Sequence, residues 1–404
     1  MDGSSLQGKY AASRIGFRTN DVLDSAMIWI AIRMLTGDPQ KFYGLLFGIA
    51  FSTLLITQQL TIFVNLIERG SSAVYNVPTA DVWVMDEVSR TPDVQFPMPP
   101  TALDAVRSVQ GVAWAVPHLR AGASVRTETG DLEGVTIVGV DDATLIGLPS
   151  RMTQGSRDVL SQPDSVIIDD VGVTNMFENG ADPIGARLEL NDQRAVIRAV
   201  ADAIPSFTSQ VTLYTRYSQA LNYVPGTRNR LSFVLAKASD GVTPEQLVER
   251  IETQTPYRAR TRDEFAQDGI DFIIENTGIP VNFGITVVLG FIVGVAIVGL
   301  TFSLFIRDNI KQFGALKAIG VTNAKIRRMV AAQAGLVGLI GYGLGVLATV
   351  AFIYAFSGVP TFKGFYIPPF VPLLSLVAVF VILALTGWIA LRGVLKTEPA
   401  AVFR

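Results

Sequence analysis

The 404-residue chain contains no cysteine and one histidine, and charged side chains make up only 17% of it. Without cysteine, neither a disulfide framework nor a thiolate metal site is possible. The single histidine, His118, is too few for a metal triad, and an isolated histidine in a strand-rich region is most often a surface or satisfied core residue. The charged fraction is well below the roughly 25% of an ordinary soluble domain. The net charge of −2 gives no reason to expect nucleic acid as a partner.

Motifs for nucleotide and catalytic chemistry are also missing. There is no G-x-x-x-x-G-K-[ST] loop, so the chain cannot cradle the phosphates of ATP in a loop of its own. There is no G-x-S-x-G nucleophile elbow either. Adjacent acids at 86–87, 141–142 and 169–170 offer oxygen ligands for Ca²⁺, but strand ends and turns are the simpler explanation. The sequence therefore predicts a non-catalytic chain with no cofactor and no metal site.

Long hydrophobic segments are what the chain does have. Four of them, 42–67, 284–306, 329–356 and 370–391, contain no Asp, Glu, Lys or Arg. Each reaches the length of about 20 residues that is needed to cross a bilayer, which is too long for a short buried core helix. The first begins too late and runs too long for a cleaved signal peptide. We therefore predict four transmembrane helices.

The basic residues of the short connecting segments predict the orientation of these helices. Residues 1–41 contain five Lys or Arg, 307–328 contain six and 392–404 contain three, whereas 357–369 contain only Lys363. Basic residues favour the cytoplasmic side. Both termini and 307–328 are therefore expected in the cytoplasm, and 68–283 and the loop 357–369 outside. Within the N-terminal segment, residues 24–35 are expected to form an interfacial helix with Trp29 at the headgroup level.

The region 68–283 is predicted to be a folded α+β domain. Short apolar runs between turn residues are typical of strands, and turn residues between two such runs indicate hairpins. Helix starts are expected where Thr precedes a helical pattern. The expected elements are strands at 81–86 and 164–170, an extended connector at 91–100, hairpins at 122–141 around Thr129–Asp131 and at 186–200 around Asn191–Asp192, and helices beginning at Thr101 and Thr243.

Small residues recur every four positions in two of the predicted spans: Gly44, Gly48 and Ser52 in the first, and Gly290 and Gly294 in the second. This spacing lets helix backbones approach closely in lipid. Packing inside one subunit and a seam between two copies are equally good explanations.

Uncharged polar residues gather near the outer end of the first span, namely Thr57, Gln58, Gln59, Thr61 and Asn65. They either line a wet seam or hydrogen-bond to neighbouring helices. They are too weakly polar for a proton relay or an ion path, which disfavours a secondary transporter or a channel.

Several stretches resemble one family. Residues 308–345 read DNIKQFGALKAIGVTNAKIRRMVAAQAGLVGLIGYGLG, and the tail 395–404 reads LKTEPAAVFR. Both resemble FtsX/MacB-type permeases, which have the type VII ABC transporter fold, and 164–190 resembles their periplasmic core domain. Residues 34–59 and 261–284 are most similar to DevC-like permeases of heterocyst-type glycolipid exporters. The resemblance implies a membrane protein with four transmembrane α-helices and a large extracytoplasmic α+β domain, a MacB-like periplasmic core, inserted between helices 1 and 2.

In this family the segment corresponding to 307–328 is the coupling element that docks on an ATPase. Phe313, Leu316 and Ile319 recur at helical spacing and predict a short apolar face that fits a groove on the ATPase. The alternative is that this face touches only lipid and that the basic residues only set topology. The family usually has Glu where this chain has Gln312, and often near Gln333. The residues assigned to ATPase coupling are Gln312, Phe313, Leu316, Lys317, Ile319 and Gly320.

The resemblance implies the permease subunit of an ABC transporter in the bacterial inner membrane, with its large domain in the periplasm. The implied partners are a separate cytoplasmic ATPase dimer, a second copy of the chain, a membrane-fusion or adaptor protein, and a lipid or other amphiphilic substrate that is moved outward by mechanotransmission. The alternative is a signalling permease whose outer domain regulates a cell-wall hydrolase or senses an antibiotic. A large outer domain of about 215 residues favours export. The sequence names neither the substrate nor the residues that would contact it.

Overall fold

The computed structural model describes residues 19–127, 130–177, 181–205, 207, 211–224, 230–359, 362 and 364–395, with side chains from residue 27 to residue 392. Residues 1–18, the turn residue Thr129, Lys363 and the tail 396–404, on which parts of the sequence interpretation rest, lie outside the described residues. The chain divides into two compact units. The helical unit comprises 1–59, 285–351 and 369–404, and the sheet unit comprises 60–284 and 352–368.

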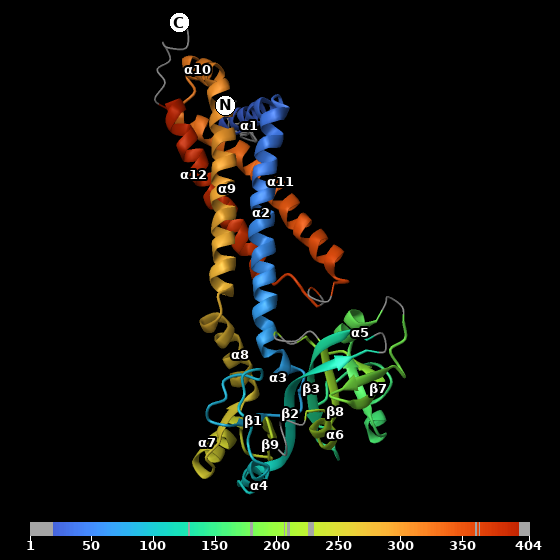
Figure 1. The fold of residues 1–404 in the computed structure, drawn as a ribbon. Coiled ribbons are helices and arrows are strands. Elements are labelled where there is room, and N and C mark those ends of the chain that lie inside the picture. Colours follow the sequence, from blue (N-terminus) through green and yellow to red (C-terminus); the bar gives the residue numbers. More distant parts are fainter. Residues whose placement is uncertain are drawn as a thin grey trace, which may run out of the picture. The chain divides into compact units, whose positions relative to one another are not determined.

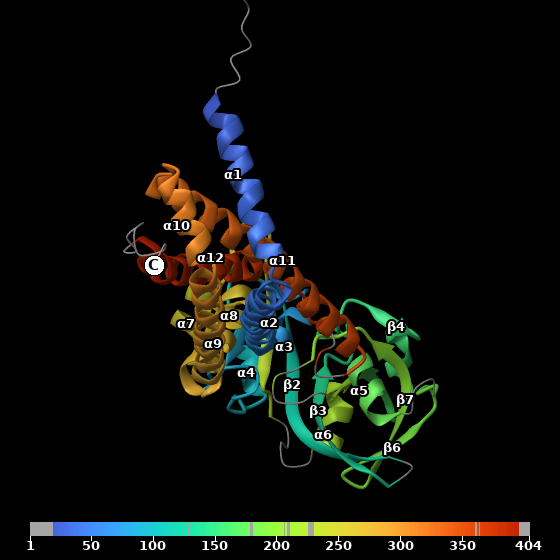
Figure 2. The same cartoon turned by 90° about the horizontal axis from the view of Figure 1, so that it is seen from above.

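Within the described residues, four helices are long and apolar enough to cross a membrane. They are α2 (Pro39–Glu68), α9 (Ile279–Asp308), α11 (Asn323–Phe356) and α12 (Phe370–Leu395). Two further helices complete the helical unit, α1 (Thr19–Thr36) and α10 (Ile310–Ala318). Figures 1 and 2 together show α1 lying across the direction of α2 and α9, which are seen end-on from above. This is the orientation that the predicted interfacial helix would need.

The sheet unit is built on a mixed sheet of ten strands among the described residues (Figure 1). The strand order is β10-β1-β9-β2-β3-β8-β5-β7-β4, and β6 pairs with both β2 and β7. The strands are β1 (Val82–Met85), β2 (Val112–Arg126), β3 (Leu132–Val140), β4 (Met152–Gln154), β5 (Ser165–Asp169), β6 (Arg187–Leu190), β7 (Gln193–Ala201), β8 (Val211–Arg216), β9 (Phe233–Ala238) and β10 (Arg258–Thr261).

Short helices surround this sheet: η1 (Arg69–Ser71), α3 (Ser72–Tyr75), α4 (Thr101–Arg107), η2 (Arg157–Ser161), α5 (Asp170–Met176), α6 (Tyr217–Tyr223), α7 (Pro244–Gln254) and α8 (Arg262–Asn276). The long strand β2 pairs with β9 through its first half and with β3 through its second half. One hydrophobic core lies on the β9 side against α4 and α7, and another lies on the β3 side against α5 and α6. β2 therefore joins two lobes of a single sheet.

The turns explain why the predicted hairpins form. β6 and β7 pair in antiparallel fashion around Asn191 and Asp192, which have positive φ angles of 48° and 62°. Asn and Asp tolerate this left-handed conformation better than most residues. The helix start at Thr243 is confirmed by a full capping box with Gln246. α4 begins at Thr101 as expected, but its N-cap is Pro100, which has no side-chain oxygen to cap with.

Candidate functional site

The predicted coupling element forms a short helix between two long ones. α9 ends at Asp308, α10 follows after Asn309, and α11 begins at Asn323. Asn309 is buried, and both its backbone amide and its side-chain amide donate to the carbonyl of Phe305, at 3.2 and 2.8 Å, so this carbonyl accepts two hydrogen bonds where the chain turns. The second turn uses Gly320 at φ +94°, a conformation that only glycine adopts without strain. The glycine at this position is therefore needed to reverse the chain into α11.

The prediction that Phe313 forms part of an exposed docking face is wrong. Its side chain is 0% exposed and belongs to the hydrophobic core of the helical unit, together with Phe305 and Ile326. Leu316 is half-buried and packs against the same core. Spacing alone predicts that Phe313 and Leu316 share a face of α10. That face is turned inward because burying it against the core of α9 and α11 removes apolar surface from water.

The outward surface of α10 has a different composition. Lys311, Gln312 and Gly320 are exposed, Lys317 is half-buried, and Ile319 is 78% exposed. Ile319 is thus the most exposed large apolar side chain of the segment 307–328.

The second position that departs from the family pattern, Gln333, lies inside the helical unit. It is 0% exposed, and its Nε2 donates to the carbonyl of Ala31 on α1 at 2.7 Å. Among the described residues, its Oε1 has no hydrogen-bond partner. An ionised Glu at this position could not donate, whereas the amide of Gln333 links α11 to α1 without burying a charge.

An ion pair joins the first turn of α2 to the last turn of α9. Lys41 Nζ lies 2.7 Å from Asp308 Oδ2 and also pairs with Asp38. The two partners are separated by more than 260 positions, so sequence reasoning treated Lys41 only as a topology marker. The pair connects the base of the first span directly to the start of the coupling element.

The small-residue stripes are used inside this subunit. A Cβ at Gly48 would lie 2.7 Å from Ile297 Cγ2 of α9, and a Cβ at Gly44 would lie 3.3 Å from Thr301 Cγ2. The Ser52 hydroxyl donates to the carbonyl of Gly290 at 2.9 Å. Ser52 also fills the space above Gly294.

The opposite face of α2 packs equally closely on α11. A Cβ at Gly341 would lie 2.8 Å from Ile49, and a Cβ at Gly345 would lie 2.6 Å from the carbonyl oxygen of Ala50. α2 therefore lies between α9 and α11 with close backbone approach on both sides. Within this chain, the small residues of α2, α9 and α11 thus take part in helix packing.

At its other end α2 leads into η1, where two glycines bring helices into backbone contact within the sheet unit. A Cβ at Gly70 would lie 2.8 Å from the carbonyl oxygen of Gly269 on α8. α8 itself is fixed at its start by a capping box between Thr261 and Glu264. The contact leaves no room for any side chain at either glycine.

Asn65 attaches the loop before α12 to the end of α2. Its Nδ2 donates to the carbonyl of Tyr366 at 2.7 Å, and its Oδ1 accepts from the amide of Tyr366 at 3.1 Å. The Tyr366 hydroxyl donates to Glu68 at 3.0 Å. Burial and this bond to a carboxylate both raise the pKa of Tyr366. The predicted external loop is therefore part of the sheet unit.

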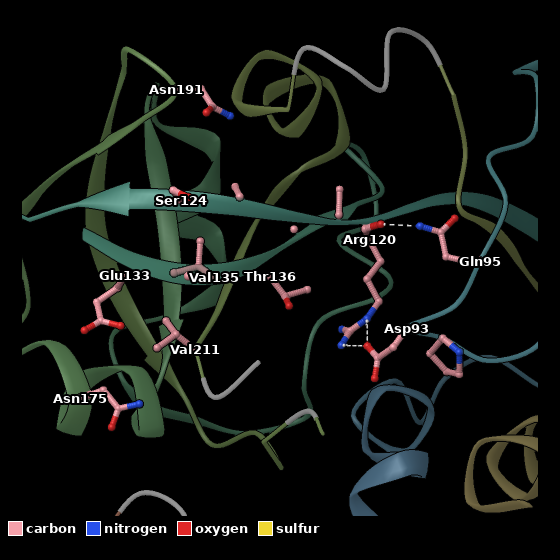
Figure 3. A pocket seen from close by; sticks show the side chains of 15 residues that line it. Asp93, Gln95, Arg120, Ser124, Glu133, Val135, Thr136, Asn175, Asn191 and Val211 are labelled. Atoms are coloured by element: carbon pink, nitrogen blue, oxygen red, sulfur yellow. Dashed lines mark hydrogen bonds and ion pairs between the residues drawn. The ribbon is translucent and has the colours of Figure 1, made fainter. Parts of the chain in front are cut away.

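A groove of about 870 Å³ runs across the second half of β2 and the adjoining part of β3 (Figure 3). Its floor is open because side chains are missing at Gly122 and Gly134, where a Cβ would meet nothing within 4 Å. At one end, Arg120 Nη2 pairs with Asp93 at 2.8 Å (Figure 3). The remaining labelled lining residues are Gln95, Ser124, Glu133, Val135, Thr136, Asn175, Asn191 and Val211. This polar lining suits contact with a polar partner.

The single histidine is a core residue with no chemical partner among the described residues. His118 is 2% exposed, its ring lies 5.5 Å from that of Trp83, and its Nδ1 has no hydrogen-bond partner there. Burial, with a smaller contribution from the nearby Arg120, lowers the pKa of His118 to about 3. The unfolded chain takes up a proton near pH 6.5, so acid favours unfolding progressively from that pH downward.

The adjacent acids serve local structure. Asp169 caps α5 by accepting from the amide of Gly172 at 2.9 Å, and it also accepts from the amide of Thr212. Asp141 accepts from the amide of Thr144 in a turn. Over the described part of the chain, no group of three or more His, Cys, Asp or Glu side chains could hold a metal ion.

Two family models match this chain. The MacB-like periplasmic core domain matches residues 44–254, and the FtsX-like permease C-terminal domain matches residues 284–399. No curated protein matches the chain.

Among solved structures, the periplasmic region of MacB from Actinobacillus actinomycetemcomitans is similar at 17% identity and a TM-score of 0.35, over 50% of this chain and 95% of that one. The extracellular domain of the noncanonic ABC-type transporter YknZ from Gram-positive bacteria is similar at 13% identity and a TM-score of 0.33, over 45% of this chain and 98% of that one. Both TM-scores are below 0.5, so a family assignment rests on the two family models.

Proposed function

Because the chain belongs to the FtsX-like permeases that carry a MacB-like periplasmic core domain, we propose that it moves a lipid or other amphiphile outward by mechanotransmission. Permeases of this family work with a cytoplasmic ATPase, which would supply the ATP hydrolysis. In this proposal the segment 307–328 and both termini face the cytoplasm, and the sheet unit lies in the periplasm. The resemblance to DevC-like permeases of glycolipid exporters supports an amphiphilic substrate.

The observation that carries the proposal is the two-sided character of α10. Its outer side presents exposed lysine and amide groups and is followed directly by the exposed Ile319, whereas Phe313 is fully buried in the core of the helical unit. A partner that binds the outer side and moves α10 would move Phe313 as well. Phe313 would then shift the side chains of α9 and α11 against which it packs. The Lys41–Asp308 ion pair offers a second connection, from α9 to the base of α2.

α2 would carry this displacement onward as one uninterrupted helix of 30 residues. At about 1.5 Å per residue it is a rod of roughly 45 Å. A second copy of the chain would complete the assembly, since an ATPase dimer presents two equivalent docking grooves. The polar groove on β2 and β3 is our candidate contact for an adaptor protein.

The decisive variant is Ile319→Asp, with Val359→Asp as its matched control. Both are exposed apolar residues, at 78% and 41%, and Val359 lies in the loop after α11. Losing an interface anchor typically costs about 2 kcal/mol, or about thirtyfold in affinity. We expect the co-purifying ATPase to be lost with Ile319→Asp and retained with Val359→Asp, at equal permease abundance in the membrane. Full ATPase retention by Ile319→Asp would remove the docking role from this helix.

A pull-down in mild detergent separates export from signalling. An adaptor together with the ATPase would support export. A cell-wall hydrolase in place of the adaptor would support a signalling permease and contradict the proposed transport.

A further inference from the structure

A second cavity lies entirely within the sheet unit, where the last turns of α2 meet the loop before α12. It has a volume of about 570 Å³ and is bordered by six residues of the segment 65–76, by residues 149–151, 202–205 and 364–366, and by Ile270. Volumes of this order are typical of sites for small molecules and lipid headgroups. No residue assigned to the coupling element, the small-residue stripes or the β2–β3 groove borders it.

Charges of both signs face this cavity in equal number. Arg151 Nη2 lies 3.4 Å from Asp202 Oδ2, and these side chains are 81% and 42% exposed. Arg69 is 6% exposed, with its guanidinium carbon 4.9 Å from the centre of the Phe365 ring. Glu68 accepts the Tyr366 hydroxyl on both carboxylate oxygens, at 3.0 and 3.1 Å. Because the ion pair between Arg151 and Asp202 is exposed to solvent, it contributes little free energy, and a charged ligand can replace it at little cost.

The remaining border of the cavity is apolar. Tyr75 is 47% exposed and Ile204 is 51% exposed, and both border the cavity beside Pro149 and Pro205. The backbone of Ile204 is held in place by Asn76, which donates to its carbonyl at 2.8 Å and accepts from its amide at 3.0 Å. Exposed aromatic and aliphatic side chains next to paired charges match a ligand that has both a charged head and an apolar tail.

We propose that this cavity binds the headgroup of a zwitterionic phospholipid. The phosphate would contact Arg69 and Arg151, the ammonium would contact Glu68 and Asp202, and the first part of the acyl chains would cover Tyr75 and Ile204. An anionic headgroup would satisfy the arginines but bring like charge to the two carboxylates. An uncharged headgroup would desolvate the exposed side chains of Arg151 and Asp202 without giving either a new ionic partner. The inference rests on the proposed function, because that function puts this end of α2 at the outer surface of the membrane.

The experiment is lipid titration of the purified, delipidated full-length chain in detergent, followed by native mass spectrometry. The probes are dioleoyl phosphatidylethanolamine, dioleoyl phosphatidylglycerol and a dioleoylglycerol with a glucose headgroup. We expect phosphatidylethanolamine to bind most tightly. Arg151→Gln should weaken its binding about tenfold, as expected for one charge-assisted hydrogen bond. Asp202→Asn should reverse the preference, so that phosphatidylglycerol binds more tightly than phosphatidylethanolamine.

Arg126→Gln is the matched control, because Arg126 is also an exposed arginine of the sheet unit, 3.8 Å from Glu189, and does not border the cavity. It should leave all three affinities unchanged. Equal binding of the three lipids, or equal effects of Arg126→Gln and Arg151→Gln, would overturn the proposal. ATPase co-purification is measured separately on the same chains. If no ATPase co-purifies with the unsubstituted chain, the proposed function is contradicted. The lipid preference is measured in the absence of ATPase, so its failure contradicts only the lipid site.

Discussion

The two ends of α2 are held by different kinds of contact. At Pro39–Lys41 the helix is held by an ion pair to Asp308, whose side chain is 60% exposed. At Asn65–Gly70 it is held by buried hydrogen bonds to the Tyr366 backbone and by backbone contact with Gly269. Exposed ion pairs contribute little and exchange readily, whereas buried hydrogen bonds and close packing are costly to break. The ion pair should therefore contribute less to holding the first end than the buried contacts contribute to holding the second.

The largest effect should come from the buried side of α10, near the first end. Phe313→Ala removes a fully buried ring and is expected to lower the free energy of unfolding by about 3–5 kcal/mol. Ile319→Ala, at 78% exposure, should change it by less than about 0.5 kcal/mol. Thermal unfolding in detergent measures both. Equal shifts for the two variants would contradict the inward orientation of Phe313.

The second end is tested through the contact between Gly70 and Gly269. Gly269→Ala forces a methyl group against the backbone of Gly70 and should destabilise the protein by about 1–3 kcal/mol. Gly284→Ala, in α9, is the control because a Cβ there meets nothing within 4 Å. In a helix that substitution should be neutral or stabilise by about 0.5–1 kcal/mol. If Gly269→Ala and Gly284→Ala shifted the melting temperature in the same direction, the close contact between Gly70 and Gly269 would not explain the effect.

Cutting the loop from the second end should have a more local effect. Asn65→Leu leaves the amide and carbonyl of Tyr366 without their partner, at a cost of about 1–3 kcal/mol that falls mainly on the loop. Hydrogen exchange of residues 364–368 should increase, while that of β5 stays unchanged. Gln58→Leu, a half-buried amide on the same helix, serves as the control. Unchanged hydrogen exchange of residues 364–368 in the Asn65 variant would show that the two hydrogen bonds between Asn65 and Tyr366 do not hold the loop.

The smallest effect is expected at the ion pair of the first end. Lys41→Met should cost no more than about 1 kcal/mol, and the difference from the unsubstituted chain should shrink in 1 M salt because exposed charges are screened. Melting temperatures at low and high salt provide the measurement. If Lys41→Met lowered the free energy of unfolding by several kcal/mol at both salt concentrations, the first end of α2 would be held as strongly as the second, and the comparison would be contradicted.

The order of elements followed from the sequence because it depends on local signals. Uncharged segments longer than a bilayer is thick predict spanning helices, and Asn191–Asp192 between β-branched arms predicts a hairpin. Spacing also predicted that Phe313 and Leu316 share a face. Which way that face points depends on α9 and α11, whose arrangement no local signal contains, so the inward orientation was missed.

The contacts that define the two ends of α2 were also beyond sequence reasoning. Lys41 and Asp308, like Asn65 and Tyr366, lie hundreds of positions apart, and each residue alone has an ordinary explanation. Asn65 gave the one usable signal, since a polar side chain in an apolar segment needs a partner. The charged residues that border the second cavity, Arg69 and Arg151 among them, gave no such signal, because charged residues on a predicted outer domain are expected anyway.

The division of the chain into two units has a mechanical consequence. The boundaries at 59–60, 284–285 and 351–352 fall inside α2, α9 and α11, so three of the four crossings are made by continuous helix. Each of these three boundaries therefore lies within a run of i→i−4 backbone hydrogen bonds, and an insertion at any of them would have to break that run.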